Sequence, residues 1–137
     1  LDKIVGDELM VLYGVPLKNE NDTENAVSTA IEMFKSLDKF NSKIIKDGFE
    51  PFQIGIGINK GKAVSGNIGS QQQMNYTVIG DTINLGARLC SHAKSGEILI
   101  SRSVKDTLTN DHKFKEISPI QVKGKSKPID VWVYHHK

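Results

Sequence analysis

The feature that most constrains the fold is a long helical pattern with strand patterns on both sides of it. Apolar residues recur at helical spacing between residues 22 and 46, and Asp47-Gly48 ends the run. The segments before and after it are short and apolar or alternating, and turn signals such as Gly6-Asp7 and Ser95-Gly96 separate them. Strands joined by tight turns and interrupted by helices favour an α+β domain with an antiparallel-rich sheet.

Composition narrows the class of protein further. The chain has 137 residues, which fits one domain with a real core. Its formal net charge is +2 and it holds no run of Lys or Arg, which argues against a nucleic-acid-binding surface. Cys90 is the single cysteine, so no internal disulfide can form, and we expect a cytoplasmic domain. No apolar stretch approaches the roughly 20 residues of a spanning helix.

Three positions suggest chemistry from their placement alone. Asp7 lies at the tip of the predicted hairpin, where a rigid turn could aim a carboxylate at a metal ion. An ordinary turn aspartate gives the same pattern. Asn84 and Arg88 lie four residues apart on a predicted helix that ends near His92, so they share one face. The arginine fork suits phosphate oxygens, although a solvated helix face is the commoner reading of such a pair.

Basic and histidine residues give weaker signals. Lys3 lies in the predicted strand four residues before Asp7 and could face a cleft or water. The lysines of the loop at residues 123–128 alternate with other residues and could bind a triphosphate, or they could be solvated. The four histidines show no zinc-binding spacing with cysteine, and we expect His135-His136 to be a C-terminal tail.

The candidate site residues Lys3, Asp7, Asn84, Arg88, Lys123 and Lys125 belong to a series of five longer motifs along the chain. The motifs are Lys3-Ile4-Val5-Gly6-Asp7 with Met10-Val11-Leu12-Tyr13-Gly14, Ile54-Gly55-Ile56-Gly57-Ile58-Asn59 with Gly66-Asn67-Ile68-Gly69, Tyr76-Thr77-Val78-Ile79-Gly80-Asp81-Thr82-Ile83-Asn84-Leu85-Gly86-Ala87-Arg88-Leu89, Gly96-Glu97-Ile98-Leu99-Ile100-Ser101, and Val122-Lys123-Gly124-Lys125. In this order they resemble the catalytic domain of class III nucleotide cyclases over the whole chain. The resemblance implies the ferredoxin-like palm of that family.

The resemblance also implies a substrate. Lys3 and Thr77 would contact adenine, whereas the guanylyl cyclases of the family typically have Glu and Cys at these two positions. Lysine can only donate hydrogen bonds, which suits N1 of adenine and not the protonated N1 of guanine. The chain therefore resembles an adenylyl cyclase, which makes cyclic AMP and pyrophosphate from ATP.

The remaining roles come from the same resemblance. Asp7 would be one of two metal-binding aspartates, and two divalent ions, Mg²⁺ or Mn²⁺, would assist attack of the ribose 3′-hydroxyl on the α-phosphorus. Asn84 would orient the ribose and Arg88 would stabilise charge on the transferring phosphate. Lys123 would contact the triphosphate, with Lys125 as a second contact. The family works as a head-to-tail homodimer with active sites at the interface, and we expect an upstream sensor or regulatory domain.

One departure from the family pattern concerns the N-terminal end. The first metal aspartate of the family belongs to a motif of the type Asp-Ile-x-Gly-Phe-Thr, and nothing similar precedes Lys3. We therefore expect residues 1–137 to form a single cyclase domain that lacks the first strand and two helices. Because one carboxylate cannot fix two ions, we expect this chain alone to have negligible activity.

Two alternatives stay open at this point. A cyclase-homology module could bind nucleotide or a partner without catalysis, although the joint presence of Lys3, Asp7, Thr77 and Arg88 argues for an enzyme. A diguanylate cyclase shares the palm architecture, and Gly6-Asp7-Glu8-Leu9 is similar to part of its signature. Val5, however, stands where that signature needs glycine.

Overall fold

The structure is a computed structural model, and it describes every residue except 2, 16, 69–74, 111 and 137. None of the helices in this described part of the chain has the length and apolar character needed to cross a lipid bilayer. The elements in chain order are β1 Lys3–Val5, β2 Glu8–Met10, α1 Asp22–Lys46, β3 Ile56–Ile58, β4 Val64–Ile68, β5 Asn75–Ile79, α2 Asp81–His92, β6 Glu97–Ser101, α3 Arg102–Thr107, β7 Lys115–Ile120 and β8 Ile129–His135.

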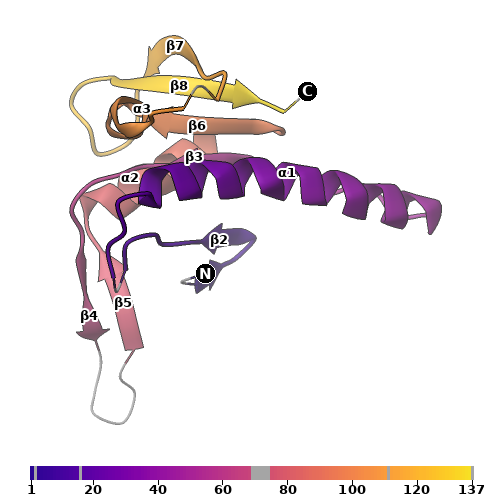
Figure 1. The fold of residues 1–137 in the computed structure, drawn as a ribbon, viewed down its shortest axis with the longest axis horizontal. Helices are drawn as coiled ribbons and strands as arrows, with labels where there is room; N and C mark the ends of the chain where they lie inside the picture. Colours follow the sequence, from indigo (N-terminus) through magenta and orange to yellow (C-terminus); the bar gives the residue numbers. More distant parts are fainter. Residues whose placement is uncertain (2, 16, 69–74, 111, 137) are drawn as a thin grey trace.

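The largest sheet has four strands in the order β3-β6-β8-β7 and lies in the upper part of the view in Figure 1. β3 runs parallel to β6, whereas β8 is antiparallel to both β6 and β7. The hairpins β1–β2 and β4–β5 form two further antiparallel pairs outside this sheet. The predicted α+β class with an antiparallel-rich sheet is confirmed.

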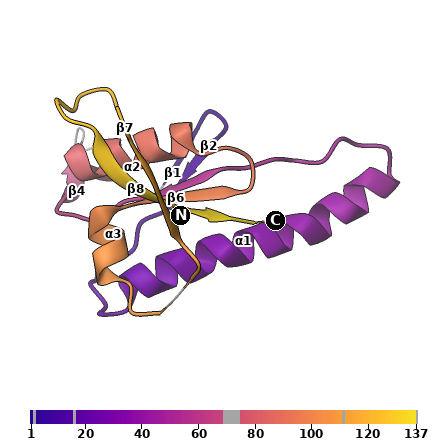
Figure 2. The same cartoon turned by 90° about the horizontal axis from the view of Figure 1, so that it is seen from above.

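The core consists of two layers, one on each face of this sheet. Successive residues of a strand point to opposite faces. Ile98 and Ile100 of β6 pack with Phe34 of α1, whereas Leu99 packs with Leu89 of α2. The two helices therefore cover opposite faces of the sheet, as Figure 2 shows from above.

Helix α2 approaches β3 more closely than any side chain would allow. A Cβ atom on Gly57 would lie 2.2 Å from the backbone nitrogen of Cys90 and 2.7 Å from the carbonyl carbon of Leu89. Backbone atoms on a packed helix cannot move aside, so glycine is required at this crossing. The alternating glycines of the central strand motif therefore serve helix packing.

The segment before β3 differs from the sequence prediction. The alternation of apolar residues with Gln or Gly over residues 52–58 predicts a strand, but β3 begins only at Ile56. Phe52 is instead bound by Asn41 of α1: Asn41 Nδ2 donates to Phe52 O and Phe52 N donates to Asn41 Oδ1, both at 2.8 Å. These bonds satisfy the backbone of Phe52 outside the sheet. The partner strand β6 begins only at Glu97, so β3 cannot extend far before Ile56.

The C-terminal end is also more ordered than the sequence suggested. The prediction of a tail at His135-His136 is wrong, because β8 extends to His135. The ring of His136 stacks on Phe34 with centroids 5.1 Å apart, and its Nε2 lies 2.7 Å from Asp38 Oδ2. His136 thus holds the end of β8 against α1.

Candidate active site

The hairpin β1–β2 presents the predicted metal ligand at its tip. Val5 pairs with Glu8, so Gly6 and Asp7 form the turn between the strands. Gly6 has a φ of 61°, which glycine adopts without steric penalty. Asp7 is exposed at this turn, and Lys3 is exposed at the start of β1. The short turn fixes where the Asp7 carboxylate can reach.

Helix α2 carries the predicted catalytic pair. Gly80 separates β5 from α2, so the strand that contains Thr77 leads directly into the helix. The register of the β4–β5 hairpin places Thr77 opposite Gly66. Asn84 and Arg88 are both exposed, and neither forms a side-chain hydrogen bond or ion pair within the part of the chain that the structure describes. One face of α2 therefore offers an amide and a guanidinium to an external ligand.

The basic loop after β7 is tied to the same helix. Lys125 Nζ lies 2.5 Å from Asp81 Oδ2 in the first turn of α2, and Gln121 Nε2 donates to Lys125 O at 2.8 Å. Lys123 is exposed on this loop. Of the two predicted triphosphate contacts, Lys123 is thus presented to solvent, whereas Lys125 has an acidic partner within the chain.

Glu8, on the same hairpin as Asp7, lies near Cys90 of α2. Burial raises the pKa of the Cys90 thiol, and the neighbouring Glu8 carboxylate raises it further. Cys90 Sγ also lies 3.7 Å from Gly55 O. A half-buried thiol kept protonated in this way is a poor nucleophile, so Cys90 serves the packing of α2 rather than chemistry.

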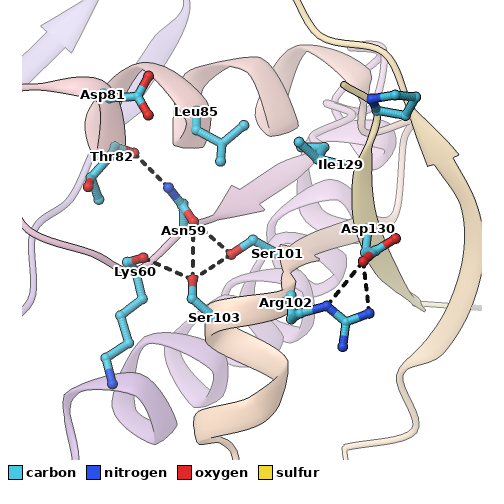
Figure 3. A pocket seen from close by; sticks show the side chains of 11 residues that line it. Asn59, Lys60, Asp81, Thr82, Leu85, Ser101, Arg102, Ser103, Ile129 and Asp130 are labelled. Carbon is cyan, nitrogen blue, oxygen red and sulfur yellow. Dashed lines mark hydrogen bonds and ion pairs between the residues drawn. The ribbon is translucent and has the colours of Figure 1, made fainter. Parts of the chain in front are cut away.

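A pocket of about 400 Å³ opens where the parallel strands β3 and β6 both end (Figure 3). Asn59 lies at its centre and connects α2 with the start of α3 through side-chain hydrogen bonds. Its lining residues are Asn59, Lys60, Asp81, Thr82, Leu85, Ser101, Arg102, Ser103, Pro128, Ile129 and Asp130. None of the predicted substrate-binding or catalytic residues lines it, so this pocket is distinct from the predicted site.

Sequence reasoning missed Asn59 and Asp81, and both had a local signal. Asn59 is the first polar residue after the apolar strand motif, and Asp81 is the first residue of a helix that follows a glycine. Polar residues at such positions commonly bind neighbouring backbone or side-chain groups. The signals were visible, but their partners are distant in sequence.

The side chains present meet part of the requirements of a divalent metal site. Asp7 is an exposed carboxylate, and Mg²⁺ is usually held by one or two carboxylates together with substrate phosphates and water. Across the described residues, no three His, Cys, Asp or Glu side chains are grouped closely enough to hold an ion. Asp7 therefore fits as one ligand, and these residues alone do not complete a metal site.

Comparison with known proteins identifies the family. The model of the adenylate and guanylate cyclase catalytic domain matches residues 3–135. The chain is 33% identical over 141 residues to the adenylate cyclase of Anabaena cylindrica, with 96% of this chain and 27% of that protein covered. The chain thus spans well under two thirds of this relative.

Two solved structures share the fold. The adenylyl cyclase CyaB from P. aeruginosa matches with a TM-score of 0.91 and 36% identity, covering 96% of this chain and 69% of that one. The guanylyl cyclase Cya2 matches with a TM-score of 0.83 and 33% identity, covering 96% of this chain and 67% of that one. The chain belongs to the class III nucleotide cyclase family, and its fold is compatible with either ATP or GTP as substrate.

Proposed function

We propose that the protein is an adenylyl cyclase that converts ATP to cyclic AMP and pyrophosphate. The observation that carries the proposal is the arrangement around α2. This helix presents Asn84 and Arg88 on one exposed face, and the Lys125–Asp81 ion pair holds the loop with Lys123 at its first turn. Groups suited to ribose and to phosphate oxygens are thereby gathered on one helix and one loop.

Each of these residues has a defined task in the proposed reaction. Asn84 orients the ribose, so that the 3′-hydroxyl faces the α-phosphorus for in-line attack. Arg88 stabilises the charge that develops on the transferring phosphate, which is the kind of interaction that lowers the barrier. Lys123 binds the triphosphate. Lys125 can bind it only if it exchanges its Asp81 partner for a phosphate oxygen.

The choice of ATP depends on Lys3 and Thr77. Lysine offers donors and no acceptor, so it complements N1 of adenine and leaves N1–H of guanine unpaired. A buried polar group that is left without its partner costs about 1–3 kcal/mol. A cost of this size on the complex with GTP is sufficient to favour ATP. The homology to a bacterial adenylate cyclase supports this choice.

Catalysis by this family generally depends on divalent ions and on dimers. We propose that Asp7 contributes one carboxylate to a site for Mg²⁺ or Mn²⁺. Two such ions, when bound, would lower the pKa of the attacking hydroxyl and neutralise phosphate charge.

A homodimer explains why Asp7 and Arg88 are both exposed in one chain. In a head-to-tail pair, Asp7 of one chain acts on a nucleotide held by Lys3, Asn84 and Arg88 of its partner. We further propose that residues 1–137 belong to a single catalytic domain, and that an attached sensor or regulatory domain controls it.

A second candidate function is a non-catalytic nucleotide-binding or dimerisation module. It is favoured by one observation, namely that the described residues do not complete a metal site. Catalysis separates the two, because only the enzyme releases pyrophosphate.

The test is an assay of the natural full-length polypeptide with ATP and GTP under Mg²⁺ or Mn²⁺. We expect cyclic AMP as the main product, with GTP used far less. The Lys3→Glu, Thr77→Cys double variant should lose ATP turnover and admit GTP. Comparable use of both nucleotides by the wild type would refute the assignment to ATP, and binding without turnover would favour the non-catalytic module.

A further inference from the structure

Asn59 is the polar residue on which four elements converge. It follows β3 directly and lies half-buried between the first turn of α2, the end of β6 and the start of α3. Figure 3 shows its carboxamide directed toward Thr82 on one side and toward Ser101 and Ser103 on the other. No proposed role in nucleotide binding falls on this residue.

Both ends of the Asn59 carboxamide are engaged. Asn59 Nδ2 donates to Thr82 O of α2 at 3.0 Å, and Asn59 Oδ1 accepts from Ser101 Oγ at 2.7 Å. The Ser103 hydroxyl is shared between Asn59 Oδ1 at 3.4 Å and Lys60 O at 2.9 Å. Ser101 is buried, and its hydroxyl also lies 3.0 Å from Ser103 Oγ, so Asn59, Ser101 and Ser103 form one hydrogen-bonded cluster.

A second set of contacts holds the first turn of α2, this time through the Thr82 side chain. Thr82 Oγ1 donates to Lys62 O at 2.5 Å, and a Cβ atom on Gly61 would lie 2.6 Å from that hydroxyl. The loop after Asn59 therefore packs directly on Thr82. The first turn of α2 is held both through its backbone carbonyl and through its Thr82 side chain.

The held turn lies immediately before the proposed catalytic face. Thr82 is two residues before Asn84 and six residues before Arg88 on one continuous helix. A helix transmits a shift of its first turn to the side chains that follow, and a misplacement of about 1 Å can cost on the order of 100-fold in rate. The orientation of α2 thus matters to the chemistry.

The pocket around Asn59 is better explained as this junction than as a ligand site. Arg102 donates to Asp130 Oδ2 through Nε at 3.1 Å and through Nη2 at 2.8 Å. Asp81 is paired with Lys125, and the Ser101 hydroxyl is bonded to Asn59. A ligand would have to replace bonds that the chain already makes.

We propose that Asn59 is a positioning residue for catalysis, which orients α2 and through it Asn84 and Arg88. The proposal rests on the proposed function of these two residues. The amide is required because it donates on one side and accepts on the other. An aspartate in its place would keep the acceptor for Ser101 and lose the donor to Thr82 O.

The first test compares Asn59 with a matched asparagine elsewhere. Asn41 also makes two hydrogen bonds through its carboxamide, both to the backbone of Phe52 and away from α2. In the natural full-length polypeptide, Asn59→Ala should lower kcat by about 10- to 100-fold with KM changed far less. Asn41→Ala should lower thermal stability and leave kcat at the wild-type value. Equal kcat in the two variants would overturn the proposal.

The second test asks whether Asn59 acts through Arg88. In a double-mutant cycle, Asn59→Ala should reduce kcat much less in the Arg88→Ala background than in the wild type. Fully multiplicative effects would show that Asn59 acts independently of Arg88 and would overturn the positioning role. If Asn59→Ala fails to fold, the isosteric Asn59→Asp takes its place in both tests, with the same outcomes deciding.

A third readout does not depend on activity. Hydrogen exchange of backbone amides in residues 82–88 should speed up in Asn59→Asp and stay unchanged in Asn41→Ala. A wild type that makes no cyclic nucleotide would refute the proposed function, while this exchange measurement would still decide whether Asn59 holds α2. Unchanged exchange in α2 would overturn the positioning role even in an active enzyme.

Discussion

Polar side chains are paired with each other where α1 meets the segment after α3, but within the described part of the chain they are exposed and unpaired on one face of α2. Where α1 meets the segment after α3, the Glu24 carboxylate lies 2.8 Å from His112 Nε2, and both side chains are largely buried. On α2, Asn84 and Arg88 are exposed and have no side-chain partner among the residues that the structure describes. Paired groups hold the chain together, whereas exposed, unpaired groups are available to a ligand or a second chain. The comparison separates the scaffold from the proposed active surface.

The Glu24 carboxylate, where α1 meets the segment after α3, accepts several hydrogen bonds. Besides His112, Glu24 Oε1 accepts from the backbone nitrogens of Thr109 at 2.7 Å and Asn110 at 3.2 Å. Burial alone would raise the pKa of Glu24, but hydrogen bonds from His112, Thr109 and Asn110 outweigh it and lower the pKa to about 2. Substitutions in the two regions should therefore affect different measurements.

The largest effect is expected at Arg88. In the natural full-length polypeptide, Arg88→Ala should lower kcat by about 100- to 1000-fold, because the guanidinium meets charge that develops in the transition state. Thermal stability should not change, since the side chain is exposed. Steady-state kinetics and thermal unfolding measure the two quantities.

The control for Arg88 is Arg102, an exposed arginine whose guanidinium is already paired with Asp130 and lies 5.1 Å from the centre of the Trp132 ring. Arg102→Ala should keep kcat and lower the melting temperature. An Arg88→Ala variant that changes KM alone would reduce the role of Arg88 to binding.

The next largest effect is expected on stability, at Glu24, where α1 meets the segment after α3. Glu24→Gln should lower the free energy of unfolding by about 1–3 kcal/mol, because a buried acceptor of several hydrogen bonds is weakened. Its kcat should not change. Glu32→Gln on the same helix is the matched control, since its ion pair with Lys35 is exposed and worth under about 1 kcal/mol. If both variants lost the same free energy of unfolding, the claim that Glu24 holds α1 to the segment after α3 would be contradicted.

The contribution of Glu24 should also depend on pH. A carboxyl group whose pKa falls from 4.5 to about 2 on folding stabilises the fold fully above pH 4.5 and loses this contribution as the pH falls toward 2. The stability difference between wild type and Glu24→Gln should therefore shrink over this range. Denaturant unfolding at a series of pH values measures it, and a difference that is constant with pH would show that the charge of Glu24 is unimportant.

The smallest effect separates two roles for Lys125. If Lys125 only holds the loop to Asp81, then Lys125→Ala and Asp81→Asn should each change KM for ATP by a few-fold, and the double variant should be no worse. If Lys125 also binds the triphosphate, Lys125→Ala should exceed Asp81→Asn. Lys123→Ala should raise KM more than either variant, because Lys123 is exposed and forms no ion pair with any residue that the structure describes.

Much of the fold could be predicted because its signals are local. The helical spacing of residues 22–46 marks α1 at the bounds that the structure gives, and the predicted helix end near His92 coincides with the end of α2. The misses have tertiary causes. β3 is shorter than its apolar pattern because its partner strand β6 begins only at Glu97, and His136 is ordered because Asp38 and Phe34 hold it.

The candidate site could be predicted only as a set of residue types. The hairpin and helix patterns placed Asp7 at a turn and Asn84 with Arg88 on one face, and the structure has this arrangement. The partner of Lys125 is 44 residues away in sequence, and spacing alone gives no information on such a pair. The roles of these side chains in nucleotide chemistry, including that of Thr77, stay predictions.

The central claim is that the exposed surfaces of the hairpin and of α2 are two halves of an active site shared between two chains. The direct measurement mixes two inactive variants of the natural full-length polypeptide, Asp7→Ala and Arg88→Ala. In a mixed dimer one site carries both lesions and the other carries none, and random exchange makes about half of the dimers mixed. Activity should therefore recover to roughly a quarter of the wild-type value. No recovery, with exchange of labelled chains shown independently, would contradict the shared site.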